Sequence, residues 1–185
     1  MRLFVALSLP EIVRQRLSGL ANGLPGARWV KPENLHLTLR FLGEVNNVTA
    51  ADVDDALAKI RSPGFDLSLT GIGHFGEGRK LRALWVGVDA SADLMRLQEK
   101  IEQALIRAGL PPESRKFKPH ITLARFKSHP GQRLQGYLTA HNLLRAGPIA
   151  MESFELYSSF TSADGAIHRI EASYPLEPAP PALQT

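Results

Sequence analysis

One short pattern occurs twice in the sequence, and its residues are able to carry acid–base chemistry. The segment HLTLRF, which begins at His36, returns 84 positions later as HITLARF, which begins at His120. A single His-x-Thr triplet means little, because a lone strand histidine is usually structural. Both copies, however, follow a Lys-Pro pair within a few residues. The repetition predicts two equivalent strands whose histidines face one cleft.

Two histidines meet the needs of an in-line displacement at phosphorus. Such a reaction needs a base that deprotonates the entering oxygen and an acid that protonates the leaving oxygen on the opposite side. Because the ordinary pKa of histidine is about 6.5, one imidazole can be neutral and the other protonated near neutral pH. His36 and His120 are therefore the predicted catalytic pair. The residues themselves do not distinguish the acid from the base.

A threonine follows each histidine at the same offset. In a β-strand, side chains two positions apart point to the same face, so Thr38 and Thr122 are expected to accompany the histidines. Their hydroxyl groups can donate hydrogen bonds to the non-bridging oxygens of a phosphoryl group. Strand threonines are often present only for their β-propensity. The identical offset in both copies favours a phosphate-binding role.

Two arginines and two phenylalanines follow the motifs. Regular alternation puts Arg40 on the face of the first histidine, and it turns Arg125 away from the face of the second. Arg40 is therefore the favoured substrate contact, and Arg125 would need a bulge or a strand end to join it. Phe41 and Phe126 could stack on a base, although a core position is the commoner role.

The remaining histidines lack a threonine at the motif offset. They are expected to be surface or structural residues, and they are His74, His129, His141 and His168.

Hydrophobic periodicity predicts a chain in which strands and helices are mixed. Strands are expected at 3–9, 34–41, 65–76, 81–90, 120–126, 149–160 and 166–176. Helices are expected at 11–24, 49–60 and 91–109, the second behind a threonine or aspartate cap and the third behind Ser91. Residues 127–147 show no clear period and are expected to form a basic loop with at most a short helical turn.

Composition indicates one globular unit. The chain has 185 residues, 44% hydrophobic, no cysteine and a formal net charge of +4. A chain of this length can bury a core, and without cysteine it has no thiolate for a disulfide or a zinc site. The positive net charge weakly favours an anionic partner. Residues 1–176 are predicted to form a single bilobal domain with one motif strand in each lobe, and 177–185 a disordered tail. The absence of an apolar run of membrane length and of a signal peptide fits a cytoplasmic protein.

At the two motifs the sequence resembles the LigT-like RNA 2′,3′-cyclic phosphodiesterases, also described as 2′-5′ RNA ligases, of the two-histidine phosphoesterase superfamily. The resemblance spans nearly the whole chain. Its segments are RLFVALSLP, NLHLTLRFLGEV, LRALWVGV, LQEKIEQAL, FKPHITLARF and FELYSSF. It implies an α+β, bilobal fold in which two antiparallel β-sheets with outer helices, related by a pseudo-twofold, flank a central cleft.

The resemblance also implies roles. His36 would be the general acid toward the leaving ribose oxygen, His120 the general base that activates water, and Thr38 and Thr122 the phosphate ligands. Arg125 matches an arginine of the family, which conflicts with the alternation argument. The implied reaction opens RNA 2′,3′-cyclic phosphate ends to 2′-phosphomonoesters without a metal or other cofactor, and some members also join 2′-5′ linkages. The implied partners are RNA ends or nucleotides, with no membrane and no obligate protein partner.

Two other classes of function remain open. A protein that binds RNA ends or nucleotides without turnover could use the same cleft. A metal hydrolase could use His36 and His120 as ligands, although neither triplet carries a further ligand at metal-binding spacing.

Overall fold

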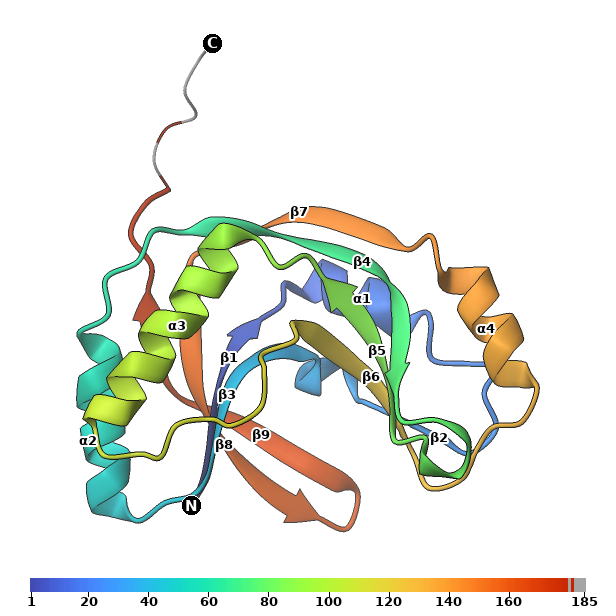
Figure 1. The fold of residues 1–185 in the computed structure, drawn as a ribbon, viewed down its shortest axis with the longest axis horizontal. Coiled ribbons are helices and arrows are strands. Elements are labelled where there is room, and N and C mark those ends of the chain that lie inside the picture. The colour runs from blue at the N-terminus through green and yellow to red at the C-terminus, as the bar shows by residue number, and fades with distance from the viewer. Residues whose placement is uncertain (180, 182–185) are drawn as a thin grey trace.

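Two antiparallel β-sheets form the frame of the computed structural model, which describes residues 1–179 and 181 (Figure 1). One sheet has the strand order β3-β1-β8-β9 and the other β2-β6-β5-β4-β7. The strands are β1 (Arg2–Ser8), β2 (Ala27–Trp29), β3 (His36–Glu44), β4 (Phe65–Phe75), β5 (Ala83–Val88), β6 (His120–Phe126), β7 (Arg145–Met151), β8 (Ser153–Ser162) and β9 (Gly165–Pro175).

The helices found in the described residues are α1 (Glu11–Ser18), α2 (Asn47–Ala58), α3 (Ala92–Arg107) and α4 (Arg133–His141), with short 3₁₀ helices η1 (Pro32–Asn34) and η2 (Gly78–Lys80). The prediction of an α+β fold with two antiparallel sheets is confirmed.

Both sheets follow one plan. In the first sheet β1 pairs with β3 and β8, and in the second β5 pairs with β6 and β4. A helix follows each central strand, α1 after β1 and α3 after β5, before the chain enters the motif strand. The motif strands β3 and β6 therefore occupy equivalent places, as the predicted pseudo-twofold requires.

Strand β1 is buried on both of its faces. Leu3, Val5 and Leu7 belong to the main core, which also contains the apolar face of α3. Phe4 and Ala6 point to the other side, where they pack with Tyr157 of β8. This second, smaller cluster lies on the same side of the sheet as the His36 ring, which stacks on Phe4.

The structure agrees with most of the predicted elements and corrects four, the first being the helix expected at 11–24, which ends at Ser18. The cap of α2 is Asn46, whose side chain accepts a hydrogen bond from the Thr49 amide, and not a threonine or aspartate. The strand predicted at 149–160 is two strands, β7 and β8. The segment predicted as a loop contains α4, whose Leu134 and Tyr137 are buried.

The predicted tail begins inside the described part of the chain. The Glu177 amide donates to the carbonyl of Ser62 at 2.9 Å, and the Glu177 carbonyl accepts from the amide of Gly64 at 2.7 Å. Residues 180 and 182–185 of the predicted tail lie outside the described residues. Of the helices in the described ranges, none combines the length and the apolar character needed to cross a membrane.

Candidate active site

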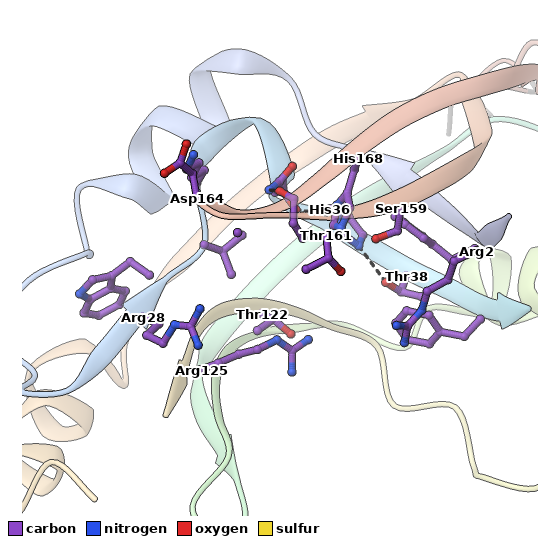
Figure 2. A pocket seen from close by; sticks show the side chains of 18 of the residues that line it. Arg2, Arg28, His36, Thr38, Thr122, Arg125, Ser159, Thr161, Asp164 and His168 are labelled. Carbon is purple, nitrogen blue, oxygen red and sulfur yellow. Dashed lines mark hydrogen bonds between the residues drawn. The ribbon is translucent and has the colours of Figure 1, made fainter. Parts of the chain in front are cut away.

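The two motif strands meet at a cavity of about 620 Å³ between the sheets. His36 and Thr38 reach it from β3, and His120 and Thr122 reach it from β6. In Figure 2, Thr122 and Arg125 face Thr38 and His36 across this cavity. The structure therefore brings together the four motif residues that the sequence places 84 positions apart.

The same hydrogen bond fixes both histidine rings. His36 Nδ1 lies 2.6 Å from the carbonyl oxygen of Asn34, and His120 Nδ1 lies 2.5 Å from that of Lys118, in each case two residues earlier in the chain. A carbonyl oxygen only accepts, so Nδ1 carries the hydrogen in each ring. Each neutral ring consequently has its lone pair at Nε2. The Nε2 atom can take a proton as a base, or give one when the ring is charged.

His36 is held in an aromatic cluster. Its ring stacks on Phe4 at 4.9 Å between centroids, and the ring of His168 meets it edge-on at 5.3 Å. Its Nε2 atom lies 2.9 Å from Thr38 Oγ1, so the threonine hydroxyl donates to the neutral ring. Burial lowers the pKa of His36 to about 4, with a further contribution from the positive charges of His168 and Arg125. The free site thus holds His36 neutral at pH 7.

His120 has a more open aromatic surrounding. Phe75 meets its ring edge-on at 4.8 Å, and Trp85 lies 6.2 Å away. Burial lowers the pKa of His120 below its usual range, and the guanidinium of Arg125 acts in the same direction. Both members of the pair therefore disfavour the charged form before an anion is bound.

The alternation argument about the arginines is wrong, because both motif strands contain a β-bulge at the same place. Opposite β1, Thr38 pairs with Ala6 and Arg40 with Val5, which leaves Leu39 as an extra residue. In β6, Leu123 is extra in the same way. A bulge of this kind reverses the faces of the residues after it. Arg125 consequently lines the cavity.

Arg40 is directed away from the cavity by its bulge. Only 7% of its side chain is exposed, and its guanidinium is paired with the carboxylate of Glu102 on α3. It also donates to the carbonyl oxygens of Phe41 and Pro111, both at 2.5 Å. The predicted substrate contact at Arg40 is replaced by a buried structural ion pair.

Phe41 takes the place on β3 that Arg125 takes on β6, since each is the fifth residue after its histidine. Phe41 is 49% exposed and lines the cavity, with its ring 5.9 Å from Phe4. The core position expected for it is wrong. Phe126, by contrast, is partly buried against the main core.

Several residues that line the cavity were not predicted as site residues, and the expectation that His168 is a surface or structural histidine is wrong. Arg2, Arg28 and Lys31 add positive charge, and in Figure 2 Arg28 and Arg2 lie toward opposite ends of the cavity. The β8–β9 hairpin contributes Thr161, Asp164 and His168. The Asp164-Gly165 pair is typical of a hairpin turn, but no local pattern indicates that the hairpin reaches the motif strands.

Fold and geometry together define a class: a phosphoesterase-like site with two histidines and two threonines on pseudo-symmetric strands, in a cavity with excess positive charge. The family model described as LigT like Phosphoesterase matches residues 7–85 and 86–168, one match for each half of the repeat. The chain belongs to the LigT-like phosphoesterase family.

Individual relatives agree with this assignment. The chain is 35% identical over 164 residues to the RNA 2′,3′-cyclic phosphodiesterase of Aeropyrum pernix, covering 86% of this chain and 91% of the relative. It is 33% identical to that of Thermotoga maritima, covering 92% of each. Among solved structures, E. coli LigT complexed with 3′-AMP superposes with a TM-score of 0.78 at 28% identity, covering 95% of this chain and 97% of that one.

Proposed function

We propose that this protein hydrolyses the 2′,3′-cyclic phosphate end of RNA to a 2′-phosphomonoester. The main observation behind the proposal is that His36 and His120 line one cavity and are held in equivalent ways. In each ring, Nδ1 donates a hydrogen bond to a backbone carbonyl. The names of the relatives in Aeropyrum and Thermotoga support the same reaction. Since both lobes line the cavity, residues 1–176 would act as one catalytic unit.

In the proposed reaction, His120 Nε2 accepts a proton from water while the water oxygen attacks phosphorus. The bond from phosphorus to the ribose 3′ oxygen breaks, and His36 Nε2–H gives its proton to that oxygen. The product carries a 2′-phosphate and a 3′-hydroxyl, one water is consumed, and solvent restores the protons on the two rings. An RNA 5′-hydroxyl in place of water would give a 2′-5′ linkage by the same steps. Thr38, Thr122 and Arg125 would contact the non-bridging oxygens.

The acid role of His36 requires help from the substrate. Its pKa of about 4 in the free site leaves the ring mostly neutral at pH 7. A bound phosphate anion opposes the positive charges that surround the ring and favours the imidazolium. Substrate binding would therefore favour protonation of His36, which prepares it to act as the acid. Thr38, whose hydroxyl donates to the neutral ring, would then turn this hydroxyl toward the phosphate.

The direct test is incubation of the protein with an RNA that ends in a 2′,3′-cyclic phosphate, followed by analysis of the product end. We expect a 2′-phosphomonoester, with the same rate after treatment with EDTA. Binding without any phosphomonoester product would favour the RNA-end-binding alternative. A rate abolished by EDTA and restored by zinc or manganese would favour a metal hydrolase. In the described part of the chain, no group of three or more His, Cys, Asp or Glu side chains is placed to hold an ion.

The pH profile of kcat/KM is expected to be bell-shaped, with one limb near pH 4 and the other below pH 6.5. Turnover needs one protonated and one neutral ring, so activity falls when both are charged at low pH and when both are neutral at high pH. The limbs follow from the lowered pKa values of His36, about 4, and His120, below 6.5. Initial rates at low substrate concentration over pH 3–8 test this profile.

Replacing His168 tests whether its positive charge contributes to the lowered pKa of His36. His168→Phe keeps a ring against Phe4 and His36 but removes a positive charge, so the acid limb should move to higher pH. His129→Phe removes a histidine outside the cavity and should leave both limbs unchanged. An unmoved acid limb in His168→Phe, or a kcat/KM limb above pH 7 in the parent protein, would contradict this account.

A further inference from the structure

A second concave surface, unrelated to the active site, lies between helices α2 and α3, which run side by side at the end of the molecule away from α4 (Figure 1). This α2–α3 groove encloses about 480 Å³ and shares no lining residue with the active-site cavity. Its charged lining consists of five cations and one carboxylate: Lys59, Arg61, Arg96, Lys100, Arg107 and Glu99. The groove therefore carries a local excess of four positive charges.

That excess is large for this protein. The whole chain has a formal net charge of +4, the same value as the α2–α3 groove alone. The active-site cavity contributes a further excess, from Arg2, Arg28, Lys31 and Arg125 against Asp164. The surface outside these two places consequently carries, on balance, no positive charge. The net positive charge of the chain is therefore concentrated at the two concave sites, whereas the lysines and arginines elsewhere are balanced by carboxylates.

Only part of the charge along α3 serves the stability of the helix, through Arg107 in the last turn and the pair of Arg96 with Asp93. Arg96, Lys100 and Arg107 are spaced by four and seven residues and so share one face of α3. Like charges four residues apart destabilise a helix slightly. Within the described residues, only Arg96 of the five groove cations has a carboxylate within ion-pair distance, the exposed Asp93. Most of the positive charge on this face is not neutralised by the protein itself.

Two of the five cations have a structural task, and the other three have exposed head groups, of which that of Arg96 is also paired with the exposed Asp93. Lys100 Nζ donates to the carbonyl of Arg61 at 2.6 Å, and Arg61 donates to the carbonyls of Ala58 and Ile60 at the end of α2. Lys59, Arg96 and Arg107 make no such bond to the backbone in the described part of the chain. Their exposed heads lie on both walls of the groove, since Lys59 follows α2 and the arginines belong to α3.

The chemistry of the lining favours a polyphosphate backbone over other anionic surfaces. None of the large apolar side chains that are exposed in the described residues lies in the groove. Stable anchoring to a lipid surface takes apolar side chains in addition to cations, and the centre of a protein interface is rich in aromatic or apolar anchors. The groove also has no aromatic ring on which a base could stack. What it offers is phosphate contacts without base readout.

We infer that the α2–α3 groove binds the phosphate backbone of the RNA whose end occupies the active site, and so makes the protein prefer RNA over mononucleotide substrates. This inference rests on the proposed function for the identity of the polyanion. The groove contributes affinity that is independent of base sequence and decreases with salt.

A triple variant tests the inference without disturbing the end of α2. Lys59→Gln, Arg96→Gln and Arg107→Gln together remove three charges and leave Arg61 and Lys100 in place. The probe is a fluorescent 30-nucleotide RNA with an ordinary 3′-hydroxyl end, which reports binding whether or not the protein is an enzyme. We expect Kd to rise at least about tenfold at low salt, and the slope of log Kd against log salt to fall by about 2, since each lost single-strand contact removes about 0.7.

A matched variant controls for net charge. Arg79→Gln, Lys80→Gln and Arg133→Gln also remove three exposed cations, none of which lines either concave site. This control should bind the 30-nucleotide RNA nearly as the parent does. If both triple variants lose affinity equally, the effect is one of net charge and the inference is overturned. An unchanged Kd and salt slope in the groove variant overturns it as well.

Steady-state kinetics separate the contribution of the groove to RNA binding from the proposed catalytic activity. With a 2′,3′-cyclic mononucleotide, the groove variant should keep the parental kcat and KM, whereas with a 30-nucleotide cyclic-phosphate RNA its KM should rise about tenfold. Absence of turnover on either substrate in the parent protein would remove the proposed function but leave the binding result standing. Loss of binding to phosphatidylserine vesicles in the groove variant, with RNA binding unchanged, would assign the groove to lipid and overturn the inference.

Discussion

Replacing either His36 or His120 by alanine is expected to lower kcat by about 10²- to 10⁴-fold, the usual contribution of a general acid or base. The two rings are held by equivalent bonds in one cavity, so neither can substitute for the other's position. Steady-state rates on a cyclic-phosphate RNA, with circular dichroism to verify folding, provide the measurement. A near-parental kcat in either folded variant would refute the pairing.

The choice of leaving group separates the acid from the base. An aryl phosphodiester releases a phenolate that needs little protonation, so it should restore much of the activity of a variant that lacks the acid. We expect this recovery in His36→Ala and not in His120→Ala. Recovery in His120→Ala alone would reverse the two roles. His141→Ala is the matched control, because His141 contacts Tyr137 outside the cavity and its loss should leave kcat unchanged.

Local signals in the sequence were enough to predict those helices that have their own capping residues at both ends. Helix α3 begins behind Ser91, whose hydroxyl accepts from the Leu94 amide at 3.2 Å, and Gly109 follows its end with φ of 96°. Helix α4 has no such cap and contains Gly136. It is held by tertiary contacts, among them the Tyr137 hydroxyl, which donates to the carbonyl of Leu20 at 2.8 Å. Hydrophobic periodicity in a short segment cannot reveal a contact between residues that are 117 positions apart in the chain.

The candidate site was predictable as far as the repeat extends. Both histidines and both threonines precede the bulges, so simple alternation gave their shared face correctly. After each bulge the faces are exchanged, and the arginine argument failed there. The insertion of one residue depends on pairing with the neighbouring strand, which the strand's own sequence does not encode. His168 was missed for a related reason, since the β8–β9 hairpin reaches His36 only in the folded chain.

Replacing Arg40 by methionine is expected to lower the free energy of unfolding by about 3 kcal/mol or more, the cost of leaving one partner of a buried ion pair alone. Glu102 is only 16% exposed and would keep just the hydrogen bond from the Glu113 amide, at 2.8 Å. The carbonyl of Pro111 would also lose its donor. Urea denaturation of the parent and the variant measures the difference.

The double variant Arg40→Met and Glu102→Leu shows whether the loss comes from the stranded charge. An apolar pair of similar volume removes the unpaired carboxylate, so the double variant should be more stable than Arg40→Met alone. Since Arg40 does not line the cavity, kcat per folded molecule should stay within about threefold of the parent in both variants. A stable Arg40→Met variant with a much lower kcat would instead place Arg40 in the active site, as simple strand alternation predicted. The two outcomes separate a residue that holds β3 to α3 from one that holds substrate, although both would look equally important in an activity assay on unpurified protein.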